Sequence, residues 1–228
     1  MISDCPVSVI LVVKNGERYI RQAIESIKNQ DAQPHEILVV DGHSTDATSS
    51  IACSFPGVTW IVQPGQGISE AYNLGIQSAT AKYLAFISHD DVWEADKLQI
   101  QFQQFLDDSE LDYSITWFDY FMDSNSKPSP AFRKELLNSH HIGKFMETLM
   151  VKRNVFNRIG FFDTAMAIAS DADWFARAQD AKLHCHLVEK VLLHKRVHDQ
   201  NTSLNYIQNN AELLLALKRS IDRKKQVK

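Results

Sequence analysis

The chain has 228 residues, of which 44% are hydrophobic and 23% are charged, and its formal net charge is −4. This composition is that of an ordinary globular protein with one sizeable core, and the slight acidic excess argues against a general affinity for nucleic acid. The three cysteines (Cys5, Cys53 and Cys185) show no metal-ligand spacing, and no apolar run reaches the length of a membrane span or signal peptide. We therefore expect a cytoplasmic protein without a disulfide framework.

The first part of the chain alternates between predicted strands and helices. Short apolar runs rich in β-branched residues predict strands at residues 7–13, 36–40, 59–62 and 83–87. Apolar residues at helical spacing predict helices at residues 17–29, 44–54 and 68–78. Repeated strand–helix units indicate the α/β class, with a mostly parallel central sheet that carries helices on both faces.

Three of these strands end in polar, turn-forming pairs, namely Lys14-Asn15, Asp41-Gly42 and Asp90-Asp91. Because parallel strands end at the same edge of a sheet, Asp41 should lie near the Asp90/Asp91 pair. A cleft with several carboxylates and the N–H groups of helix starts suits a nucleotide whose phosphates bind a metal. A turn or capping role is the alternative for Asp41.

Asp90 and Asp91 are adjacent carboxylates at the end of an apolar strand. Two such groups repel each other, and Mg²⁺ or Mn²⁺ would remove the conflict because these ions prefer oxygen ligands. The alternative is a helix cap within a solvated turn.

The segment Gly65-Gln66-Gly67 invites comparison with the dinucleotide-binding fingerprint. That fingerprint fails at Glu70, where its third glycine should stand, so we reject NAD as a ligand. We expect a tight loop that borders the same cleft, with Asn73 on the helix behind it.

Three stretches together resemble the nucleotide-sugar-binding half of family 2 glycosyltransferases: VSVILVVKNGE, EILVVDGHSTDAT and GQGISEAYNLGIQSATAKYLAFISHDDVW. The resemblance covers residues 6–93. Within the family, the chain is most similar to the branch that has the sequence VDG in the second motif. It implies the GT-A fold, with a Rossmann-like sheet. It further implies that Asp41 contacts the base, Asp90 the ribose or sugar, and Asp91 the metal. Donor contacts are also expected from Val13, Asn15, Gly67 and Asn73.

The resemblance implies one glycosyltransferase domain over residues 1–228, with the donor half at 1–93 and the acceptor and catalytic half at 94–205. In the second half we predict a helix at 93–106, an aromatic strand at 112–123 and a flap at 124–144. Trp117 and Tyr120 are expected in the core, with sugar stacking as the alternative.

The block at residues 148–177 is similar to the second conserved block of the same family, and Asp171 matches its catalytic base. An inverting transfer is one displacement that needs a single carboxylate to accept the acceptor proton. Asp173 competes for this role, and one of the two acids could merely cap the following helix at 174–179.

Late strands are predicted at residues 183–187 and 191–197. His184 and His186 are expected to be surface or packing residues, because a zinc site would need further ligands. His198 resembles the late histidine of the family that reaches the metal or the diphosphate. Arg196 could neutralise a phosphate or pair with an acid.

The C-terminal segment 206–228 is predicted as an amphipathic, basic helix. The ordinary expectation is that it packs on the sheet with a solvated end. The alternative is peripheral contact with anionic lipid at the inner membrane face.

The predicted function is an inverting glycosyltransferase that uses Mn²⁺ or Mg²⁺ and moves a sugar from a nucleotide-diphosphate donor, with UDP expected, to a glycan or lipid-linked acceptor. Cell-surface polysaccharide or glycolipid synthesis would be its setting. A nucleotidyltransferase and a non-catalytic nucleotide-sugar-binding module are the alternatives, and a glycosidase would need its two carboxylates on either side of the scissile bond. No feature of the sequence indicates an oligomeric state.

Overall fold

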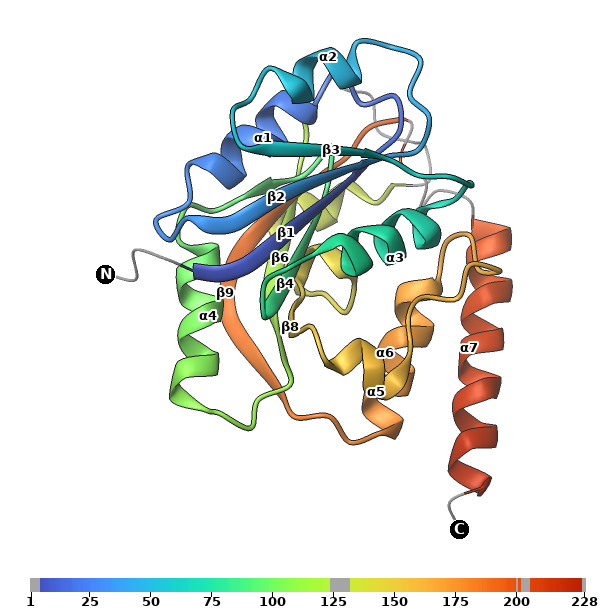
Figure 1. Cartoon of the computed structure of the whole chain (residues 1–228). Coiled ribbons are helices and arrows are strands. Elements are labelled where there is room, and N and C mark those ends of the chain that lie inside the picture. Colours follow the sequence, from blue (N-terminus) through green and yellow to red (C-terminus); the bar gives the residue numbers. More distant parts are fainter. Residues whose placement is uncertain (1–4, 124–131, 200, 202–205, 227–228) are drawn as a thin grey trace.

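The computed structural model describes residues 5–123, 132–199, 201 and 206–226 (Figure 1). The strands are β1 (Cys5–Val13), β2 (Pro34–Asp41), β3 (Val58–Val62), β4 (Tyr83–Ser88), β5 (Val92–Trp93), β6 (Tyr113–Phe121), β7 (His140–Ile142), β8 (Met150–Lys152) and β9 (Cys185–Arg196). The helices are α1 (Ile20–Lys28), α2 (Thr48–Cys53), α3 (Ile68–Ser78), α4 (Lys97–Asp107), α5 (Val155–Ile159), α6 (Ser170–Asp180) and α7 (Tyr206–Gln226), with 3₁₀ turns η1 (Lys134–Asn138) and η2 (Met146–Thr148).

One mixed sheet runs through the molecule in the order β3-β2-β1-β4-β8-β6-β9-β5, and β7 pairs with β6. Strands β3, β2, β1 and β4 are parallel to one another. Strand β8 is antiparallel to both β4 and β6, and β9 is parallel to β6. Strands β6 and β9 therefore point the same way as β1, which brings their carboxyl ends to the same edge. The predicted α/β class with a mostly parallel sheet is confirmed.

The central strands are continuously apolar because helices cover both faces of the sheet. On one face, Val9 and Leu11 of β1 pack with Ile24 of α1 in a core that also includes α4. On the other face, Ile10 belongs to a second core built with α3, α5 and α6. Helix α3 approaches β1 closely because Gly75 has no side chain: an added Cβ would lie 2.5 Å from Ile10 Cγ2.

Several element boundaries differ from the predictions. The short strands β5, β7 and β8 were not predicted, and Trp93 belongs to β5, so that α4 begins only at Lys97. The two predicted late strands form the single strand β9, whose register against β6 shifts near Trp117. Of the predicted flap, residues 124–131 lie outside the described residues, and the remainder contains η1 and β7.

Helix α7 packs beside α6 at the outside of the molecule (Figure 1). The prediction that the C-terminal helix packs on the sheet is therefore wrong. Many of the contacts of α7 are polar, since Arg223 and Ser220 bind Asp180 and Arg219 binds Asp163, while Ala216 is buried. The apolar side chains of Leu213, Leu214, Leu215, Leu217 and Ile221 are exposed on α7, and helical spacing places Leu214, Leu217 and Ile221 together on the side away from the buried Ala216. No helix in the described part of the chain has the length and apolar character to cross a membrane.

Candidate active site

A cavity of about 430 Å³ opens at the carboxyl edge of the sheet. Strand register builds it: Val13 at the end of β1 is opposite Asp41 of β2, and Val12 is opposite Ser88 of β4. Among the predicted site residues, the cavity is lined by Val13, Asn15, Gly67, Asp90 and His198. The strand ends therefore meet as expected, and the C-terminal end of β9 joins them.

Asp90 and His198 form the centre of this edge. Oδ2 of Asp90 lies 2.9 Å from Nε2 of His198 and 3.3 Å from Nδ2 of Asn201, and all three side chains line the cavity. Burial alone would raise the pKa of Asp90, but the hydrogen bond with His198 and the charge of Lys195 bring this pKa well below its ordinary value. Asp90 therefore presents an ionised carboxylate.

Asp91 faces the protein interior. It is 1% exposed, it does not line the cavity, and its Oδ1 accepts a hydrogen bond of 3.0 Å from the backbone N–H of Arg196. Its Oδ2 lies 3.3 Å from Nζ of Lys195, and burial raises the pKa of the carboxyl group. In this structure Asp90 and not Asp91 therefore lines the cavity, and the assignment of the metal ligand between them stays a prediction.

Lys195 and Glu147 line the cavity but were not among the predicted site residues. Nζ of Lys195 is 3.3 Å from Asp91 and 3.9 Å from Glu147, and these carboxylates outweigh burial and raise its pKa above the ordinary value. Glu147 lies in η2 and accepts a hydrogen bond from Ser88. The sequence contains a clue to Lys195, because this basic residue lies three positions before His198 at the end of the last strand. Glu147 has no such neighbour, so no sequence pattern indicated it.

Asp41 occupies the end of β2, yet its carboxylate is turned into its own loop. It is 4% exposed, accepts hydrogen bonds from the N–H and Oγ of Ser44, and does not line the cavity. Its neighbour Gly42 and the buried Gln63 line the cavity instead. Within the described residues, Oε1 of Gln63 has no hydrogen-bond partner. A buried unpaired acceptor at a cavity wall is suited to a ligand N–H.

Asn73 does not face the cavity either. Its amide makes a reciprocal pair of 2.9 Å hydrogen bonds with the backbone carbonyl and N–H of Phe162. The prediction of a donor contact is therefore corrected, because both ends of the amide tie α3 to the loop before α6.

Asp171 is the second residue of α6 and lies beyond the cavity lining. Burial and the nearby charge of Glu147 raise the pKa of its carboxyl group to about 7. A pKa near neutrality suits a group that takes up a proton during a reaction. Its role as a catalytic base stays a prediction.

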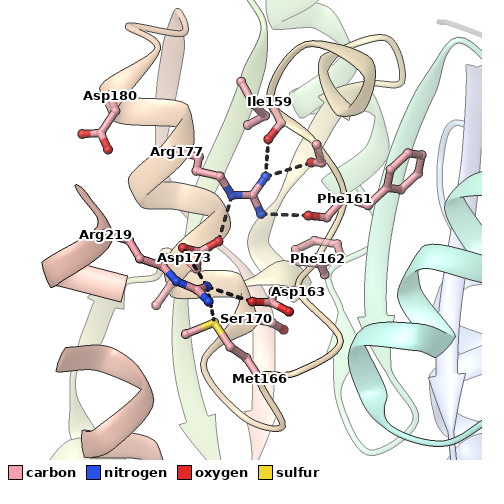
Figure 2. A network of polar contacts seen from close by, with 12 residues as sticks. Ile159, Phe161, Phe162, Asp163, Met166, Ser170, Asp173, Arg177, Asp180 and Arg219 are labelled. Atoms are coloured by element: carbon pink, nitrogen blue, oxygen red, sulfur yellow. Dashed lines mark hydrogen bonds and ion pairs between the residues drawn. The ribbon is translucent and has the colours of Figure 1, made fainter. Parts of the chain in front are cut away.

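Asp173 has a structural role, as Figure 2 shows. Its carboxylate pairs with Nε of Arg177 at 2.8 Å. The same guanidinium binds the backbone carbonyls of Ile159, Gly160 and Phe161. Because Asp173 is buried and committed to this network, Asp171 is the better candidate for a base.

Arg196 and Trp117 both contact other protein groups. Arg196 is 2% exposed and binds Asp123 and Gln22, so it pairs with protein groups and does not face a phosphate. Trp117 is half-buried and stacks on His140 at a centroid distance of 4.8 Å.

Acidic and basic side chains both line the cavity. Asp90 and Glu147 lie on its wall together with the amines of Lys14 and Lys195, and Asp91 contacts Lys195 from outside the lining. The described residues hold no cluster of three or more side chains that could ligate a metal on their own. The pair of one carboxylate and one imidazole nonetheless fits a divalent cation whose other ligands are substrate phosphates and water.

Comparison with known proteins gives a consistent result. The family model for glycosyl transferase family 2 matches residues 8–168. An uncharacterized glycosyltransferase of Rickettsia prowazekii is 30% identical over 226 residues, which cover 91% of this chain and 70% of that protein.

Two solved structures share the fold. The structure of TarS from S. aureus in complex with UDP-GlcNAc superposes with a TM-score of 0.75 at 19% identity, covering 95% of this chain and 66% of that one. The mannosyltransferase PcManGT from Pyrobaculum calidifontis, in complex with GDP-Man and Mn²⁺, gives a TM-score of 0.71 at 20% identity and covers 95% of this chain and 64% of that one.

Proposed function

The chain belongs to glycosyl transferase family 2 and has the GT-A fold, and we propose that it transfers a sugar, with inversion, from a nucleotide-diphosphate donor to an acceptor hydroxyl. Membership of this family favours a glycosyltransferase over the nucleotidyltransferase and glycosidase alternatives. The observation that carries the proposal is the Asp90–His198 pair, which faces a cavity of about 430 Å³ at the carboxyl edge of the sheet.

The donor is proposed to lie in this cavity with its base toward Gly42 and Gln63 and its diphosphate toward Asp90. Gln63 lines the cavity but its unpaired Oε1 is itself buried, so it would accept a hydrogen bond from a base N–H once the side chain turns toward the ligand. Uracil offers such a group at N3 and guanine offers one at N1, so this contact fits both bases, and UDP is proposed on the family resemblance. The solved relatives were bound to UDP-GlcNAc and to GDP-Man, so both bases belong in an experimental test.

Asp90 and His198 are the residues that would hold a divalent cation. When bound, such an ion would neutralise charge on the departing diphosphate. The protein's own contribution is a protonated Lys195 at the same wall, which provides a fixed positive charge where the leaving group gains negative charge. Asp91 and Glu147 hold that amine in place.

Asp171 is proposed to accept the proton of the acceptor hydroxyl as its oxygen attacks the anomeric carbon. One displacement at that carbon inverts its configuration and needs no covalent intermediate. A carboxyl pKa of about 7 leaves a substantial ionised fraction at neutral pH and matches the basicity that proton transfer requires.

A panel of UDP- and GDP-sugars, each with and without Mn²⁺, tests this function. Release of the nucleoside diphosphate together with a new glycosidic bond of inverted configuration is the expected result. Release of pyrophosphate from a nucleoside triphosphate would identify a nucleotidyltransferase. Binding of a nucleotide sugar without turnover under any acceptor would support a binding module.

The outer face of α7 supports a lipid-linked acceptor at a membrane surface. Leu214 is 68% exposed and Leu217 is 57% exposed, and Lys218 and Lys225 lie on the same exposed side of the helix. An apolar stripe with flanking cations matches the boundary of an anionic bilayer.

Vesicle flotation tests this membrane contact. The protein should float with vesicles of phosphatidylcholine and phosphatidylglycerol, and much less with phosphatidylcholine alone. The double substitution Leu214→Ser and Leu217→Ser should abolish flotation without loss of sugar transfer to a soluble acceptor. Failure to float, or a dimer in solution that the same double substitution converts to a monomer, would contradict membrane contact.

A further inference from the structure

The loop of residues 166–169 before α6 is held by a glutamate from the distant C-terminal helix. The Glu212 carboxylate accepts hydrogen bonds from three successive backbone N–H groups, those of Ala167 at 3.0 Å and of Ile168 and Ala169 at 2.8 Å each. Burial alone would raise the pKa of Glu212, but these bonds lower it below the ordinary value. The group is therefore an ionised acceptor at neutral pH.

The same loop is held from the opposite side by the start of α3. Oγ of Ser69 lies 2.9 Å from the carbonyl oxygen of Met166 and 2.8 Å from Oγ of Ser170. Both serines are buried. The loop thus lies between α3, whose first residues border the donor cavity, and α7.

This loop connects the two parts of the proposed site. Ala167 lines the donor cavity, and Asp171 follows the loop by two residues at the start of α6. A displacement of the loop would therefore move one wall of the cavity and the carboxyl group of Asp171 together. Geometry errors on the order of 1 Å can lower a rate by up to about 100-fold.

We propose that Glu212 is a positioning residue for sugar transfer, which acts through the loop and sets the place of Asp171 relative to the donor. The inference rests on the proposed function, because it requires Asp171 to be the base. Glu212 lies on α7 and does not line the cavity, so its effect is indirect. Three bonds from N–H groups to an ionised carboxylate hold the backbone more firmly than bonds to a neutral acceptor.

The test compares Glu212→Gln with Arg223→Ala. Glutamine keeps the size of the side chain but replaces one acceptor oxygen by an NH₂ group, which cannot accept the loop N–H bonds. Arg223→Ala is a control for a general loss of contacts between α7 and α6: it removes the bond to Asp180 at the other end of α6 and a longer 4.0 Å contact with Asp173, but it leaves Glu212 and its bonds to the loop N–H groups in place. We expect Glu212→Gln to lower kcat roughly 10- to 100-fold with a much smaller change in donor Kd, because Ala167 is the one residue of the loop that lines the cavity, and Arg223→Ala to preserve kcat.

Hydrogen exchange at the backbone amides of residues 167–169 gives a readout that does not depend on activity. These amides should exchange faster in Glu212→Gln and at the native rate in Arg223→Ala. Unchanged kcat and unchanged exchange in Glu212→Gln would overturn the proposal, as would an equal loss of kcat in both variants. If Asp171→Asn abolishes transfer but Glu212→Gln does not, only the positioning role fails. If the wild-type protein transfers no sugar, the proposed function fails.

Discussion

Oδ2 of Asp90 lies 2.9 Å from Nε2 of His198, although 108 positions separate the two residues in the chain. The contact exists because β4 and β9 end at the same edge of the sheet. It places a carboxylate and an imidazole on one cavity wall, next to a protonated lysine. The pair is the centre of the proposed donor site.

Substitution of Asp91 should affect stability more than metal dependence. Asp91→Asn replaces the buried carboxyl group that contacts Nζ of Lys195, and it leaves Asp90 in the cavity wall unchanged. We expect a loss of about 1–3 kcal/mol in the free energy of unfolding, measured in urea, with the metal dependence of donor binding retained. Loss of metal dependence in a stably folded Asp91→Asn would restore Asp91 as the ligand.

Lys195→Met should destabilise the protein. The substitution keeps most of the side-chain length but leaves the carboxylates of Asp91 and Glu147 near each other without their shared cation. Removing one partner of a buried ion pair costs about 3–5 kcal/mol. Urea denaturation should show this loss, and Lys195→Arg should recover most of it; equal midpoints for Lys195→Met and wild type would refute the ion-pair account.

The pH dependence of transfer should follow the ionisation of Asp171. A base must be deprotonated, so kcat should rise as the pH passes upward through about 7 and then level off. Asp171→Asn should remove transfer and preserve donor binding. A rate that does not change between pH 5 and pH 9 would exclude this carboxyl group as the base.

The same raised pKa predicts a stability effect of opposite sign. A carboxyl group whose folded-state pKa lies above its unfolded value favours folding at low pH, and this contribution is lost as the pH rises through about 7. Asp171→Asn should therefore raise the melting temperature at pH 8 more than at pH 5. A variant with lower stability at pH 8 would contradict this environment for Asp171.

Gln63→Leu should weaken nucleotide binding without loss of stability. Oε1 of Gln63 has no hydrogen-bond partner within the described residues, so its removal leaves no protein group of that region unpaired. A lost hydrogen bond of about 1.4 kcal/mol corresponds to a tenfold rise in the Kd for UDP. Calorimetric titration should show this rise; a UDP affinity equal to that of wild type would place the base elsewhere.

The fold could be predicted because short, local sequence patterns identify most of its strands and helices. Continuous apolar runs identified the buried parallel strands, and the order of strands and helices brought Asn15 and Asp90 to the same edge. His198 was assigned to the site only through the family resemblance. The sequence alone does not show where the side chain of a single histidine after a strand points.

The remaining errors concern orientation. Asp90 and Asp91 lie in the turn between β4 and β5, where side chains follow no regular alternation, so the sequence does not show which of the two faces the cavity. Asn73 binds Phe162, a backbone partner 89 positions away that no local pattern indicates. Helix α7 has an amphipathic pattern, yet its apolar stripe faces outward, because its polar side chains bind Asp163 and Asp180.

The most direct test of the donor site is calorimetric titration of UDP and GDP sugars into wild-type protein and into Asp90→Asn, each with and without Mn²⁺. We predict that at least one donor binds wild type more tightly when Mn²⁺ is present, and that Asp90→Asn loses this Mn²⁺-dependent gain while keeping its fold. Equal affinity of Asp90→Asn and wild type in Mn²⁺, or no binding of any nucleotide sugar, would contradict the assignment of this cavity.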